Sequence, residues 1–147
     1  MSSFRYVSRW LSWAACPSRR LRSWRIEWIV AQDCDAALVI ARAYWRRATV
    51  VDRGPTGFGA RISFEYELAS TLARHFGPEC ERFLVDCAVK DSPYASAYCI
   101  VALGLLHSKE LTGLRSKLPH RTEMTRWRLG CYSSTATLGD LVGMEDL

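Results

Sequence analysis

Apolar residues recur every three or four positions along most of this 147-residue chain. Such spacing places them on one face of an α-helix, which turns once in about 3.6 residues. It predicts a succession of short helices, over 4–15, 18–32, 35–47, 63–76, 79–90, 91–106, 108–118, 124–131 and 138–142. We therefore predict an all-α fold in which short antiparallel helix pairs stack into a helical array or close into a compact bundle.

The segment "DSPYASAYCIVALGLLHS" (residues 91–108) is apolar on almost every side of its predicted helix. Ser92 and Pro93 suit the N-cap and the first helical position, where a hydroxyl oxygen accepts a backbone N–H and proline needs no donor. From Tyr94 to Leu106 all but two residues are apolar or cysteine, and a helix without a polar face needs neighbours around it. The run is shorter than the roughly 20 residues of a bilayer span. We expect an interior helix of an α-helical stack.

The same segment resembles the first helix of a HEAT-like repeat of the phycobilisome-lyase type, with an Asp-Ser-Pro opening and an Ala-Leu-Gly-x-Leu close at 102–106. The following "SKELTGLRSKL" looks like the second helix, so the resemblance covers residues 91–118. A second Leu-Gly pair, Leu138-Gly139, indicates a degenerate further unit at 121–142. Where the family usually has an arginine that pairs with the opening aspartate, this chain has Ser96. The resemblance implies repeated helix pairs with an extended protein-binding surface.

One stretch interrupts the helical pattern, because "VVDRGPTGFGARIS" (residues 50–63) has three glycines and a proline. It predicts a Gly-rich loop, or a small hairpin that pairs 49–51 with 60–62, within residues 49–62. Its glycines lack the Gly-Lys-Ser/Thr ending of a phosphate-binding Walker loop. A sharper interpretation is an anion site, in which Arg53, Arg61 and the helix N-terminus at Ser63 concentrate positive potential.

Positive charge is concentrated at the start of the chain. Residues 1–26 hold six arginines and no acid, whereas residues 27–147 hold 14 basic and 15 acidic groups. The formal net charge of +5 therefore resides in the N-terminal segment, which could meet nucleic acid, an anionic lipid surface or an acidic protein. The candidate partner-binding or anion-binding residues are Arg19, Arg20, Arg22, Arg25, Arg53 and Arg61.

Two interpretations of "RRLRSWRIEW" remain open. Arginines on phosphates with tryptophans stacked on bases are typical of proteins that bind single-stranded nucleic acid. Trp24 and Trp28 also complete a helical stripe with Leu21 and Ala31, so the alternative, which we favour, makes them core residues and the arginines a solvated face.

The composition is that of an ordinary globular protein, and we predict a single domain over residues 1–147 with residues 1–17 as a loosely packed basic segment. That start shares its arginine and serine content with organellar transit peptides, while its apolar part is too short and interrupted for a signal peptide. Six irregularly spaced cysteines without a Cys-x-x-Cys pair are expected to be reduced core residues in a cytoplasmic protein.

Candidate chemistry is sparse. The three histidines show no metal-ligand spacing, and helix acids such as Glu79, Asp86 and Asp91 suit surface and capping positions. We predict no catalytic, cofactor-binding or metal-binding residue. The expected function is a non-enzymatic protein-binding module that acts as an adaptor or inhibitor, a bacterial immunity protein being one example. The competing expectation is a nucleic-acid-binding protein that uses the basic, Trp-rich N-terminal segment.

Overall fold

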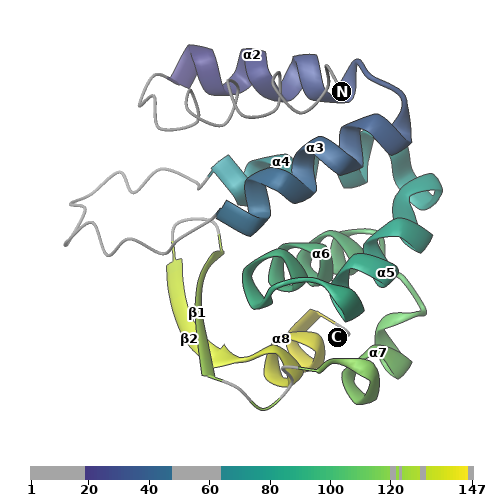
Figure 1. Ribbon diagram of the computed structural model, residues 1–147, viewed down its shortest axis with the longest axis vertical. Helices are drawn as coiled ribbons and strands as arrows, with labels where there is room; N and C mark the ends of the chain where they lie inside the picture. The colour runs from purple at the N-terminus through teal and green to yellow at the C-terminus, as the bar shows by residue number, and fades with distance from the viewer. Residues whose placement is uncertain (1–18, 48–63, 120–121, 123, 130–131, 146–147) are drawn as a thin grey trace.

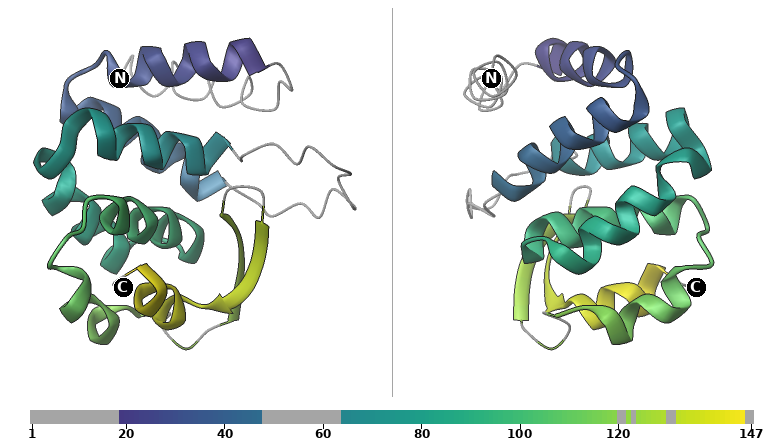
Figure 2. Two further views of the ribbon diagram at one scale, coloured as in Figure 1. Left: turned by 180° about the vertical axis from the view of Figure 1, so that it is seen from behind. Right: turned by 45° about the vertical axis from the view of Figure 1, so that its right-hand side comes forward.

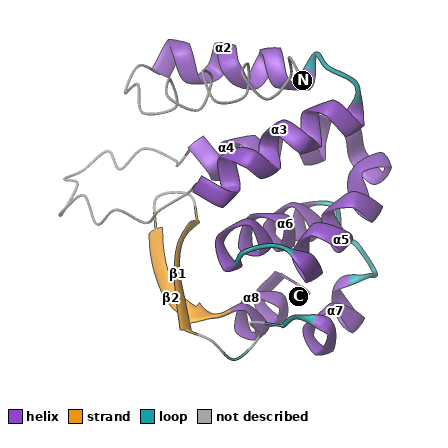
Figure 3. Ribbon diagram, in the orientation of Figure 1, coloured by secondary structure: helices purple, strands orange, loops and turns teal. Residues whose placement is uncertain are grey.

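The computed structural model describes residues 19–47, 64–119, 122, 124–129 and 132–145, which form seven α-helices, one 3-10 helix and one two-stranded sheet (Figures 1 and 3). The all-α class predicted from the sequence is confirmed, with one short β-hairpin as the exception. The predicted helix at 4–15 and the loop or hairpin at 49–62 lie outside the described residues. In chain order the elements are α2 (Arg19–Val30), α3 (Cys34–Arg47), α4 (Phe64–Phe76), η1 (Gly77–Cys80), α5 (Glu81–Lys90), α6 (Pro93–Leu105), α7 (Leu111–Lys117), β1 (Met124–Leu129), β2 (Tyr132–Thr137) and α8 (Leu138–Glu145).

Local sequence signals set the ends of the helices. The carboxylate of Asp33 accepts a hydrogen bond from the backbone N–H of Ala36 at 2.9 Å and caps α3. Gly77 follows α4 with φ at +57°, a left-handed conformation that glycine adopts without strain. Ser92 and Pro93 begin α6 as predicted, although the Ser92 hydroxyl makes no capping hydrogen bond within the described residues.

The helices form two layers (Figures 1 and 2). In one layer α6 packs between α4 and α8; in the other, α3 contacts η1, which leads into α5, and α5 contacts α7. The pairs α3–α4, α5–α6 and α7–α8 join the two layers, and α2 covers one end against α3 and α4. Every residue from Ala95 to Gly104 is buried, which confirms the predicted interior helix. The HEAT-like character of this stack stays a prediction.

Aromatic packing joins α3 to the interior helix. Trp45 of α3 is fully buried, lies stacked near Tyr98 of α6 at a ring-centroid distance of 6.4 Å, and donates its indole N–H to the carbonyl of Glu65 at 3.1 Å. A buried indole needs such an acceptor because an unpaired buried donor is costly.

The buried face of α2 differs from the predicted one. Ile26 and Ile29 are buried, whereas Trp24 is 56% exposed and Trp28 is half-buried. The expectation that Trp24 is a core residue is therefore wrong. Because apolar residues occupy most positions from 24 to 30, more than one stripe fits the helix, and packing against α3 and α4 selects the isoleucines.

Residues 124–129, the described part of the helix predicted at 124–131, form a strand instead. Strands β1 and β2 pair antiparallel, from Met124 opposite Thr137 to Leu129 opposite Tyr132. Among the described residues of the predicted further repeat unit at 121–142, helix begins at Leu138. Threonines and aromatic residues, which both segments contain, favour strands.

Candidate functional site

Four of the six arginines predicted to bind a partner or anion lie within the described residues, all of them on α2. The backbones of Arg19, Arg20 and Arg22 lie at the start of α2, and Arg53 and Arg61 lie outside the described residues. Arg25 is only 1% exposed, so its guanidinium does not belong to the outer surface of α2. Burial raises the pKa of Tyr44 on α3, and the positive charge of Arg25 opposes that rise.

A buried charge cluster fixes α3 to the turn between α5 and α6. The carboxylate of Asp91 accepts hydrogen bonds from Nε of Arg42 at 2.5 Å and from Nε of Arg46 at 2.6 Å. The backbone N–H of Ser92 donates to the same carboxylate at 2.8 Å. The Asp91 side chain is 1% exposed, whereas those of Arg42 and Arg46 are 32% and 52% exposed. A carboxylate taken out of water is stable here because both its oxygens are bonded to cations.

These hydrogen bonds also govern ionisation. Burial of the Asp91 carboxylate opposes its charge, but the hydrogen bonds from Arg46, Arg42 and the Ser92 amide outweigh burial and lower its pKa. The surface position expected from the sequence is therefore wrong for Asp91, which is buried, whereas the capping position is confirmed because Asp91 is the C-cap of α5. Ser96, at the position where the HEAT-like family usually has the pairing arginine, donates instead to the carbonyl of Ala88 at 2.8 Å.

A groove of about 680 Å³ lies over η1 and α5 and reaches the start of α3. We call it the α3–α5 groove. Its charged lining residues are exposed, and its apolar ones are half-buried against the core. They are Asp35 from α3, Glu79 from η1, and Arg82, Phe83, Val85, Asp86 and Val89 from α5.

The thiol of Cys34, at the start of α3, lies in the field of the groove's acids. Burial raises its pKa first, and the negative charges of Glu79, Asp35 and Asp33 raise it further. The acids therefore impose a negative potential on this end of the groove, although the whole chain carries a formal charge of +5.

The described cysteines are core residues, as expected. Cys34, Cys80, Cys87 and Cys99 are free and buried. Burial raises the pKa of Cys80 to about 11 and that of Cys99 well above its ordinary value, so both remain protonated near neutral pH. A hydrogen bond from Cys99 lowers the pKa of Cys87. Cys16 and Cys131 lie outside the described residues.

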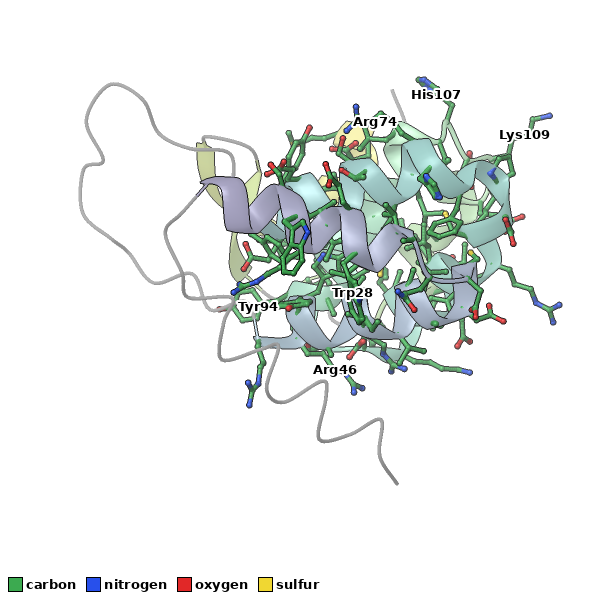
Figure 4. The ribbon with its side chains drawn as sticks, turned by 90° about the horizontal axis from the view of Figure 1, so that it is seen from above. Trp28, Arg46, Arg74, Tyr94, His107 and Lys109 are labelled. Atoms are coloured by element: carbon green, nitrogen blue, oxygen red, sulfur yellow. The ribbon has the colours of Figure 1, made fainter. Side chains whose placement is uncertain are left out.

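Other polar groups are dispersed. Figure 4 shows Arg46 projecting from one side of the molecule and Arg74 and His107 from the other. Among the residues that the structure describes, no cluster of three or more His, Cys, Asp or Glu side chains could hold a metal ion. The same part of the chain has no helix of the length and apolarity that a membrane crossing requires.

A scan against protein-family models, a search of the curated proteins and a search of the solved structures found no match to this chain. The α3–α5 groove is therefore the candidate site on its geometry alone. Sequence reasoning missed it because its walls come from segments that are far apart in the chain, and no motif joins Asp35 to Asp86.

Proposed function

We propose that this protein is a non-enzymatic, protein-binding helical module that acts as an adaptor or inhibitor. The observation that carries the proposal is the α3–α5 groove, where half-buried apolar side chains lie among exposed charges. Partner surfaces typically combine an apolar centre with a polar rim. Phe83, Val85 and Val89 supply the apolar part, and Asp35, Glu79 and Asp86 the polar part.

The charge cluster at Asp91 supports this proposal because it holds the end of α5, the helix that lines most of the groove, to α3. Asp91 follows α5 directly, and its hydrogen bonds hold it to Arg42 and Arg46 of α3. A surface that is already ordered loses less conformational entropy when a partner binds. The groove is accordingly suited to recognition by rigid docking.

In-cell photo-crosslinking tests the proposal. A photoreactive amino acid replaces Val85 in the groove, and a matched chain carries it at Met144, which is 58% exposed on α8. We expect the groove probe to capture a protein that the α8 probe does not. That protein, purified separately, should form a complex of fixed stoichiometry with the unmodified chain in light scattering. The proposal fails if both positions capture the same set of proteins, or if the groove captures none.

Nucleic-acid binding is a second candidate, favoured by the exposure of Trp24. This indole is 56% exposed on a helix that begins with Arg19 and Arg20, and exposed aromatic side chains beside basic residues can stack on unpaired bases. Under this alternative, affinity for a single-stranded oligonucleotide should fall steeply with salt, because each phosphate contact releases a counterion. Trp24→Ala should then weaken binding while the unfolding midpoint stays in place. Binding at background level for the unmodified chain would reject it.

A further inference from the structure

We propose that the α3–α5 groove binds a cationic amphipathic segment of another protein, one that presents lysine or arginine beside aliphatic side chains. This inference rests on the proposed function and specifies the chemistry of the partner. It is carried by the combination, in one concave surface, of acidic groups and accessible apolar side chains.

The charge of the groove is opposite to that of the chain. The groove is lined by three acidic residues, Asp35, Glu79 and Asp86, and one basic residue, Arg82, so three negative charges and one positive give its lining a formal charge of −2. The whole chain has a formal charge of +5. A cationic partner would be drawn to this groove and repelled by the basic N-terminal segment, and this contrast favours one docking position.

Two of the carboxylates are available for a partner. Neither Asp35 nor Glu79 has an ion-pair partner among the described residues, and both are exposed. Asp86 pairs with Lys90 at 2.7 Å, one turn along α5, in a contact whose two side chains are more than half exposed. Such an exposed pair is weak and exchanges readily for a partner's cation.

The apolar part of the groove requires that the partner also present aliphatic side chains. Val85 and Val89 lie one turn apart on α5 and are half-buried, as is Phe83. A segment with aliphatic side chains along one stripe and cations beside it would cover the valines while its charges reach the carboxylates. Nucleic acid and anionic lipid would instead be repelled.

Peptide binding tests the inference. The probe is a fluorescein-labelled peptide of about 18 residues, five helical turns, with leucine and lysine at amphipathic spacing. Its counterpart has glutamate in place of every lysine. Fluorescence anisotropy of each peptide is measured against the full chain. We expect saturable one-to-one binding of the lysine peptide that weakens as salt is raised, and no binding of the glutamate peptide.

Charge-reversal variants locate the binding. The double variant Asp35→Lys, Glu79→Lys should lower the affinity for the lysine peptide by at least about tenfold, since two attractive contacts become repulsive. The matched control is Glu27→Lys with Glu110→Lys, which changes the net charge equally at exposed acids outside the groove. It should leave affinity within about twofold. Circular dichroism melting checks folding, and Asp35→Asn with Glu79→Gln replaces the first pair if the reversal unfolds the chain.

Several outcomes would overturn the inference. One is equal binding of both peptides, and another is an equal loss of peptide affinity in the groove variant and its control. A third is a concentration-dependent dimer that the groove variant abolishes, since the occupant would then be a second copy. The crosslinking experiment separates this inference from the function beneath it. A partner captured at Val85 through a neutral or acidic segment would refute the cationic ligand and leave the protein-binding function standing. Peptide binding at the groove without any captured cellular partner would support the preference for cationic segments and contradict the proposed protein-binding function.

Discussion

The carboxylate of Asp91 and the guanidinium of Arg42 are 49 residues apart in the chain and meet at 2.5 Å. The carboxylate is buried, while the arginine side chain is 32% exposed. The two side chains of this ion pair therefore differ in whether water can hydrate the charge that remains when the other side chain is removed. An orphaned arginine can regain water, but an orphaned Asp91 stays in the protein interior.

This asymmetry predicts a non-additive mutant series. Asp91→Asn should lower the free energy of unfolding by about 2 kcal/mol, the value of a hydrogen bond to a charged group. Arg42→Gln and Arg46→Gln should each have a smaller effect, because the other arginine still binds Asp91. Together they should lower it by about 3 to 5 kcal/mol, since the buried carboxylate is then unpaired.

Denaturant unfolding measures this series. Lys90→Gln is the control, because it breaks only the exposed pair with Asp86 and should change stability by less than about 0.5 kcal/mol. Strict additivity of the two arginine variants would contradict the shared role of Asp91.

The same carboxylate predicts a pH dependence. The folded state lowers the pKa of Asp91, so its ionised form stabilises the fold fully above the ordinary aspartate pKa of about 3.9. That stabilisation is lost as the pH falls from there through the lower folded pKa. The difference in unfolding free energy between the natural chain and Asp91→Asn should thus be constant from pH 5 upward, on the order of one unit above that pKa, and shrink in acid.

Glu145 has the opposite effect on the pH dependence of stability. Burial raises its pKa, so protonation of its carboxyl group stabilises the folded state as the pH falls. Both chains retain Glu145, so its contribution cancels in the difference. A difference that grows in acid would show that the Asp91 pKa is raised instead.

Gly104 predicts a steric effect where α6 meets α8. A Cβ atom at this position would lie 2.9 Å from the Cβ of Glu145, closer than packing allows. Gly104→Ala should therefore destabilise the fold by about 1 to 3 kcal/mol, the usual range for overpacking. Gly113→Ala in α7 has nothing within 4 Å of the added atom and should stabilise by up to about 1 kcal/mol through helix propensity.

Thermal unfolding of both glycine variants shows directly whether each substitution raises or lowers the stability. Adding Glu145→Gly to the Gly104→Ala variant should recover part of the loss, because it removes the contacting side chain. Equal effects of the two alanine substitutions would argue against close contact between α6 and α8.

Two tryptophans should respond differently to truncation. Trp45 is fully buried and bonded to the Glu65 carbonyl, so Trp45→Ala should lower the free energy of unfolding by about 3 to 5 kcal/mol. Trp24 is 56% exposed, and Trp24→Ala should have an effect of about 1 kcal/mol or less. Chemical unfolding compares them. A large loss for Trp24 would restore the core role that the sequence suggested.

The predictability of each element depended on how many structures its sequence pattern allowed. Helix α6 was predictable because its residues are apolar almost throughout, so any rotation about its axis leaves it buried. Helix α2 was predictable as a helix but not in orientation, because tryptophans and isoleucines alternate along it. The β-hairpin was missed because Met124, Trp127 and Cys131 match a helical stripe by chance, while the threonines that favour strands lie between and after them.

The site was less accessible to sequence reasoning than the fold. Asp91 looked like a capping residue because it adjoins Ser92 and Pro93, and its arginine partners lie 45 and 49 residues earlier. Asp35 and Glu79 look like ordinary first-turn residues of α3 and η1, a local role they also fulfil, and Asp86 looks like half of an exposed pair along α5. Only the packing of α3 against η1, which leads into α5, reveals that they share a surface.

The enclosure of α6 has a consequence for synthesis on the ribosome. Helix α6 ends at Leu105, but α8, which covers one of its flanks, begins at Leu138. At 5 to 20 residues per second, translation leaves that flank uncovered for about 2 to 7 seconds. During this interval the nascent chain displays an apolar helix that chaperones can bind, and a chain released before residue 138 would retain that exposed flank and be a substrate for quality-control proteases.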